Sequence, residues 1–164
     1  MPLMVWVVRY MQIDVLSSLI FVAAGFAIAV ILELDNRGIH DSEKGDFRRK
    51  ITDEAPDILD QLVSDSTCSR ILYSNWLSRA EAVKAEMLGD EAYGALKKFY
   101  DSVKTRNEYF SSRHGFDPQH VEKLNRSIID DFFEGCTQIS WFKESVGKRR
   151  IDDLHSKIKR TALL

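Results

Sequence analysis

Residues 15–32 read VLSSLIFVAAGFAIAVIL and hold 18 consecutive uncharged residues, of which 11 are Val, Leu, Ile or Phe. A helix of that length spans roughly 27 Å, close to the ~30 Å hydrocarbon core of a bilayer. Each large apolar residue near the membrane centre favours insertion by about 0.3–0.6 kcal/mol. The stretch therefore predicts a transmembrane helix over residues 15–34, with these anchor residues: Val15, Leu19, Val22, Phe26, Val30 and Leu32.

Basic residues are distributed unequally on the two sides of this stretch. Arg9 is the only Lys or Arg ahead of it, whereas five follow it within 18 residues: Arg37, Lys44, Arg48, Arg49 and Lys50. Loops rich in Lys and Arg stay in the cytoplasm. The sequence thus predicts a single-pass protein of the cell membrane, with a short extracytoplasmic tail over residues 1–14 and the C-terminal part in the cytoplasm.

Two alternatives to an anchor stay open. Ala27, Ile28 and Ala29 form an A-x-A pattern, so the stretch could be a signal peptide whose cleavage releases a secreted helical bundle. Against this, the apolar run exceeds the ~7–15 residues usual for a signal peptide, and Asp14 lies where such a peptide is basic. The other alternative, a buried core helix, would need a partner surface on every side.

Gly25 and Ala29 lie four residues apart inside the predicted span. Small residues at this spacing let two membrane helices approach closely. The pair therefore favours, as a hypothesis, a helix–helix contact that forms a homodimer.

The rest of the chain has the composition of one helical domain. Residues 35–46 are polar and are expected to form a linker, and residues 47–164 are enough for a hydrophobic core. Helix formers dominate after residue 50, and the sequence shows no strand pattern of alternating Val, Ile or Thr. The predicted fold class is all-α: one N-terminal transmembrane helix followed by a four- to five-helix antiparallel bundle.

Apolar spacing and capping residues define the expected helices of this domain. Pro56 is expected to kink or break the first of them, Thr137 to cap the last and Gly147 to bend it. Asn107 falls within an apolar stripe, where a polar residue usually fixes the register of packing. The expected helices cover residues 47–51, 56–64, 67–88, 90–112, 117–134 and 137–158.

Two Asp-x-x-His pairs are the strongest enzymatic signal in the sequence. They are Asp117 with His120, and Asp152 with His155. Bundles that hold two metal ions place a carboxylate and a His at this spacing on two helices and take further carboxylates from two others. Carboxylates available for that role are Glu81, Glu86, Asp101 and Glu108, but no pattern directs them inward. A metal-binding bundle enzyme is therefore the alternative function.

Other chemistries find little support. The sequence has no G-x-S-x-G, P-loop, H-E-x-x-H or Gly-rich phosphate motif, so no catalytic residue and no cofactor is predicted. Cys136 follows Gly135 at an expected helix start, where the pKa of a thiol can be lowered. Cys68 and Cys136 are nevertheless better interpreted as packed thiols. A net charge of −2 argues against nucleic-acid binding.

Residues 143–160 hold seven Lys or Arg against three acids. We expect an outer helix of the bundle with a solvated basic face, and contact with an anionic leaflet is the alternative. The chain as a whole is best interpreted as a non-enzymatic interaction, scaffold or signalling-accessory module. Its expected partners are the lipid bilayer and another protein or a second copy. An aromatic seam is available for a partner, though core packing explains it better: Phe99, Tyr100, Tyr109 and Phe110.

Overall fold

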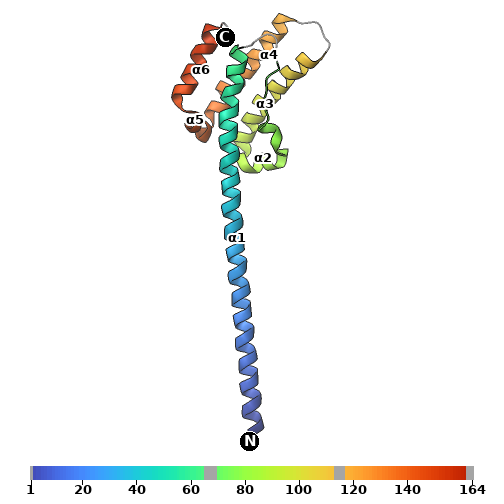
Figure 1. Cartoon of the computed structure of the whole chain (residues 1–164), viewed down its shortest axis with the longest axis vertical. Coiled ribbons are helices and arrows are strands. Elements are labelled where there is room, and N and C mark those ends of the chain that lie inside the picture. Colours follow the sequence, from blue (N-terminus) through green and yellow to red (C-terminus); the bar gives the residue numbers. More distant parts are fainter. Residues whose placement is uncertain (1, 65–69, 113–116, 162–164) are drawn as a thin grey trace. The chain divides into compact units, whose positions relative to one another are not determined.

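The computed structural model describes the backbone of residues 2–64, 70–112 and 117–161, and within these ranges the side chains from residue 22 onward. These ranges contain six α-helices and no strand, so the all-helical prediction is confirmed. The helices are α1 (Pro2–Ser64), α2 (Glu81–Leu88), α3 (Asp90–Ser111), α4 (Pro118–Asp130), α5 (Ser140–Val146) and α6 (Lys148–Arg160) (Figure 1).

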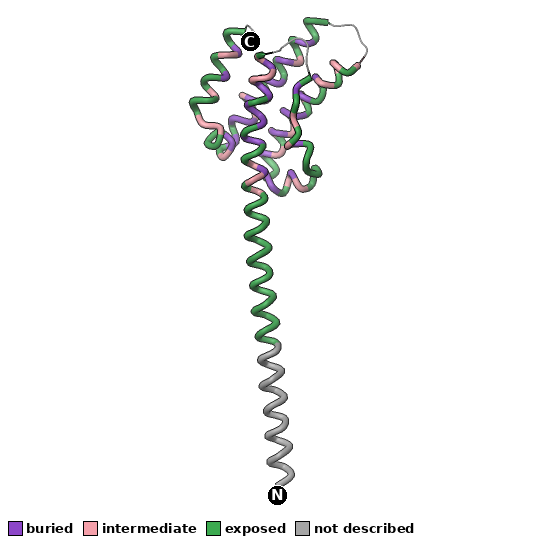
Figure 2. The backbone as a smooth tube through the Cα atoms, in the orientation of Figure 1, coloured by how far each residue is buried: buried purple, intermediate pink, exposed green. Residues whose placement is uncertain are grey.

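The chain divides into two compact units, Met1–Glu43 and Lys44–Leu164. Unit 1 contains only α1, and its described side chains, residues 22–43, are all exposed (Figure 2). Within the part of the chain whose side chains are described, no helix carries an apolar run sufficient to cross a membrane. Residues 15–21 of the predicted span lie outside that part.

The polar residues expected to form a linker are helical in the structure. α1 continues through residues 35–46 and includes Gly38 and Gly45. A glycine inside a helix costs only about 1 kcal/mol relative to alanine. The segment contains no proline, and ion pairs four residues apart support the helix, such as Arg37 to Glu33 at 3.0 Å.

Residues 44–64 of α1 form the centre of unit 2. Their buried apolar side chains recur every three or four residues: Phe47, Ile51, Ala55, Ile58, Leu59 and Leu62. They belong to one core with apolar side chains of α3, α4, α5 and α6 (Figure 2). Pro56 lies inside α1 and does not end it. Burial of side chains on both sides of Pro56, each worth about 1.5–3 kcal/mol, offsets the cost of about 3 kcal/mol for an interior proline.

The helix predicted over residues 67–88 is not formed as one element, and that prediction is wrong. Residues 70–75 are not helical, a single 3₁₀ turn covers Trp76–Ser78, and α2 begins only at Glu81. Cys68 lies outside the described residues. This segment runs back along α1, since Leu72 contacts Gln61, Trp76 contacts Glu54, and Leu88 contacts Arg48.

Because residues 70–78 run back along α1, α3 packs parallel to the last part of α1 and not antiparallel to it. α3 runs the same way as the last part of α1, because Arg48 contacts Leu88 just before α3 and Glu54 contacts Tyr100 in its middle. α3 and α4 are antiparallel neighbours, as predicted for successive helices, with Lys98 next to Asp131 and Arg106 next to Asn125. The bundle is therefore helical as predicted, but not antiparallel throughout.

Of the later predicted helices, α3 and the start of α4 are as expected, whereas the single helix predicted over residues 137–158 is wrong. α3 covers the expected residues, and α4 begins at Pro118. Asp117 caps α4, because its carboxylate accepts the Gln119 N–H at 3.0 Å. The helix then continues into a π-helical turn (Asp131–Gly135) and a 3₁₀ turn (Cys136–Gln138). Thr137 does not cap α5, because its hydroxyl donates to the Phe133 carbonyl. Gly147, at φ +79°, separates α5 from α6 completely.

Candidate interaction surface

Two amide side chains hold residues 71 and 72 in their non-helical path. Gln61 on α1 accepts the Leu72 N–H at 2.8 Å and donates to the Leu72 carbonyl at 3.0 Å. Asn107 on α3 accepts the Ile71 N–H and donates to the Ile71 carbonyl, both at 2.8 Å. The backbone polar groups of two consecutive residues are thereby satisfied without a helix or a sheet.

Glu54 holds residues 74–76. Its buried carboxylate accepts the N–H groups of Ser74 and Asn75 at 2.7 Å and that of Trp76 at 3.1 Å. The Tyr100 hydroxyl also donates to it, at 3.0 Å. A buried charge is tolerated only when it is well hydrogen-bonded, and these four donors meet that need. Burial, together with the negative charge of Glu54, raises the pKa of Tyr100 well above its ordinary value.

Aromatic and ionic contacts fix the end of this segment. The buried Trp76 ring stacks on Tyr100 with centroids 4.6 Å apart and planes 6° apart. The buried Lys84 ammonium lies 4.3 Å from the centre of the Trp76 ring and 2.6 Å from the Glu81 carboxylate. Hydrogen bonds from Lys84 and Tyr93 lower the pKa of Glu81. The segment from residue 71 to residue 76 is therefore rigidly attached to α1, α2 and α3.

This rigid segment exposes two leucines. Leu72 is 77% exposed and Leu77 is 63% exposed, and the described part of unit 2 exposes no other large apolar side chain. Leu72 lines two grooves, one of about 420 Å³ on the α3 side and one of about 410 Å³ on the α1 side. The Leu72 surface is defined by the exposed and half-buried side chains that line these grooves: Asp53, Asp57, Gln61, Arg70, Leu72, Tyr73, Ser74, Asn75, Leu77, Lys104, Asn107 and Glu108.

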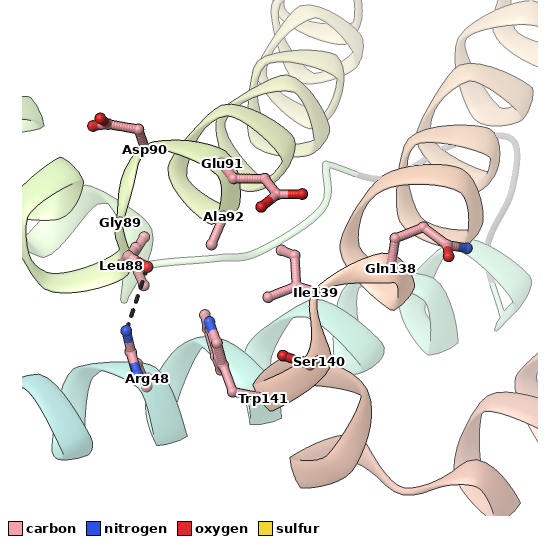
Figure 3. A pocket seen from close by; sticks show the side chains of 10 residues that line it. All are labelled: Arg48, Leu88, Gly89, Asp90, Glu91, Ala92, Gln138, Ile139, Ser140 and Trp141. Atoms are coloured by element: carbon pink, nitrogen blue, oxygen red, sulfur yellow. Dashed lines mark hydrogen bonds between the residues drawn. The ribbon is translucent and has the colours of Figure 1, made fainter.

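A further pocket of about 330 Å³ lies between Glu91 and Ile139 (Figure 3). On one side of it the Arg48 guanidinium donates to the carbonyls of Met87 at 3.2 Å and Leu88 at 3.3 Å, and lies 4.9 Å from the Trp141 ring centre. A cation at this position is favourable because the last carbonyls of α2 carry partial negative charge. Arg48 therefore has a structural use, and the pocket presents no cluster of reactive groups.

The predicted metal ligands lie at the start of α4 and on α6, and the two histidines contact aromatic rings. Asp117 caps α4, and the exposed His120 packs on Tyr109 with ring centroids 4.7 Å apart. The exposed His155 contacts the edge of Phe133, with centroids 5.3 Å apart, and Asp152 is exposed on α6. Across residues 22–161, outside the gaps at 65–69 and 113–116, no three His, Cys, Asp or Glu side chains gather as metal ligands would.

Cys136 is a packed thiol. It is fully buried in the core, and this burial raises the pKa of the thiol. A nucleophilic cysteine needs the opposite shift and some exposure. The neighbouring helix start therefore does not activate Cys136.

The predicted anchor residues are described only in part. Val22, Phe26, Val30 and Leu32 are exposed on α1, whereas Val15 and Leu19 lie outside the described side chains. Ala29 is exposed, and no atom lies within 4 Å of the position that a Cβ on Gly25 would occupy. Both positions are therefore open to contact with another molecule.

The basic C-terminal helix packs on the bundle. Leu154 and Ile158 are buried, Arg150 lies 2.5 Å from Asp57, and Lys157 lies 3.0 Å from Asp60. α6 is thus attached to α1 by two ion pairs and packs on the core through these two apolar side chains.

Sequence reasoning identified Asn107 as a polar residue inside an apolar stripe but missed Glu54, Gln61 and the exposure of Leu72. A signal was present, since residues 64–78 contain several Ser and an Asn, which favour non-helical backbone. No protein family, no curated protein and no solved structure matches this chain.

Proposed function

We propose that this protein is a membrane-anchored helical module that binds another protein through the Leu72 surface. One observation carries the proposal. In the described part of the chain, the exposed large apolar side chains lie in two places only, residues 22–39 of α1 and the segment of Leu72 and Leu77. Each place has a different geometry, and each geometry suits a different partner.

On α1 the exposed apolar residues face every direction. At 100° per residue, Val22, Ile31 and Leu32 lie on different sides of the helix, and all three are exposed. A helix that is apolar all round requires an apolar environment all round, which a bilayer supplies. This supports residues 15–32 as the anchor, and the five basic residues after it support a cytoplasmic C-terminal domain.

On the segment of Leu72 the apolar residues form one small patch with polar residues at its edges. Glu54, Gln61 and Asn107 already hold the backbone of this segment in place. A partner that binds a preformed surface avoids the entropy cost of ordering it. Exposed apolar patches with a polar rim are typical of protein–protein contacts. The patch therefore supports binding of a protein and not catalysis.

Site-specific photocrosslinking tests this function in membranes that contain the full chain. A photoreactive amino acid at position 72 is expected to give a discrete adduct with one protein. The same amino acid at the exposed Ser156 on α6 serves as the control and is expected to give none. Absence of an adduct from position 72, or equal adducts from both positions, would contradict the proposal.

A further inference from the structure

We infer that the protein bound by the Leu72 surface places an apolar residue on Leu72 and an arginine or lysine in the groove on the α1 side. The inference rests on the proposed function and names the chemistry of the segment that the same surface binds. Leu72 supplies the apolar contact, because it is the most exposed large apolar side chain in the described part of unit 2. The charges around the groove decide the rest.

The groove on the α1 side runs along the helix. Asp53, Asp57 and Gln61 line it at intervals of four residues, so they follow one face of α1. Residues 72–75 form the opposite side, and the backbone of Leu72 is hydrogen-bonded to Gln61. The stretch of helix from Asp53 to Gln61 rises roughly 12 Å. Asp53 therefore lies about two helical turns along the groove from the level of Leu72.

The lining of this groove is acidic. Three of the described residues that line it are Asp or Glu, and none of them is Lys, Arg or His. Arg150 pairs with Asp57 at 2.5 Å. Asp53 and Glu54 have no ion pair within the part of the chain that the structure describes, and the four groups that donate to Glu54 are uncharged. The groove thus keeps two negative charges for a partner, and that of Asp53 is exposed.

Tyr73 responds to this negative charge. Its half-buried side chain lines both grooves. Burial, together with the carboxylates of Glu108 and Glu54, raises the pKa of its hydroxyl. A cation attracted by the carboxylates also gains from an aromatic ring at the same place. Both kinds of group on the α1 side therefore favour a basic side chain.

The groove on the α3 side has the opposite balance of charge. Arg70 and Lys104 line it with one acid, Glu108. Lys104 lies 3.7 Å from Glu108, whereas Arg70 is exposed and has no ion pair within the described residues. The α3 side thus repels a cation that the α1 side attracts. Opposite charges across an interface fix its register, so a partner segment lies with its basic residue toward Asp53.

Photocrosslinking from position 72, in membranes that contain the full chain, supplies the readout. Asp53→Lys is expected to lower the adduct yield about tenfold, because like charges then meet. Asp53→Glu keeps the charge and is expected to keep the yield. The matched control is Asp152→Lys, which makes the same change at an exposed position on α6 and is expected to leave the yield unchanged.

The partner provides the second half of the test. Mass spectrometry of the adduct locates the partner residue attached to position 72. An Arg or Lys is expected about eight residues from it in a helical segment, or about four residues from it in an extended one. Changing that residue to Glu should restore the yield with Asp53→Lys to the wild-type level.

Wild-type yield with Asp53→Lys, or no recovery with the reversed partner residue, would overturn the inference. The adduct with the unaltered chain would then still support the proposed function. No adduct, or an adduct with lipid alone, would contradict the proposed function as well.

Discussion

Glu54 shows how one side chain can change the course of the backbone. Three N–H groups of residues 74–76 donate to its carboxylate, so these residues need no helical partners. The same carboxylate accepts from Tyr100, whose ring stacks on Trp76. The position of the Leu72 surface therefore depends on a residue that is itself buried and distant in sequence.

Glu54→Gln is expected to lower the free energy of unfolding of the full chain by about 2–3 kcal/mol. Hydrogen bonds to a charged group are stronger than those between neutral groups, and the new amide N–H groups would face N–H groups that need an acceptor. Glu144→Gln, at an exposed position on α5, makes the same chemical change and should alter it by less than about 0.5 kcal/mol. Chemical denaturation followed by circular dichroism measures both. Equal effects of the two variants would show that the Glu54 contacts contribute little.

At the scale of elements, helices with local signals were predictable and the segment held by distant side chains was not. Asp117 and Pro118 define the start of α4, and Gly89 the start of α3, within a few residues of sequence. Residues 67–88 have helical apolar spacing, yet Gln61, Asn107 and Glu54 hold their first part in another conformation. The exposure of Leu72 follows from those contacts, so the spacing of apolar residues alone does not reveal it.

Two glycines should respond in opposite ways to the same substitution. Gly94 lies exposed within α3, and no atom lies within 4 Å of the position that an added Cβ would take, so Gly94→Ala should stabilise the fold by about 0.5–1 kcal/mol. Gly147 has φ +79° between α5 and α6, so Gly147→Ala should destabilise it by about 1–3 kcal/mol. Thermal unfolding of both variants measures the two signs. A destabilised Gly94→Ala or a neutral Gly147→Ala would contradict this assignment of the helix break.

At the scale of the whole molecule, α1 contributes to both units. Residues 22–34 expose apolar side chains on all sides, whereas residues 47–62 supply the centre of the core of unit 2. The apolar content of residues 15–32 and the excess of basic residues after them were evident from sequence, because both are properties of composition. The proposed function depends on this difference between the exposed apolar part of α1 and the part that supplies the core of unit 2.

The measurement that tests the anchor most directly is the intact mass of the chain recovered from membranes after an alkaline wash. We expect the full 18.9 kDa chain in the membrane pellet, and a variant without residues 15–32 in the supernatant. Recovery of the full chain in the supernatant, or of a chain shorter by the 29 residues that end at Ala29, would contradict the account.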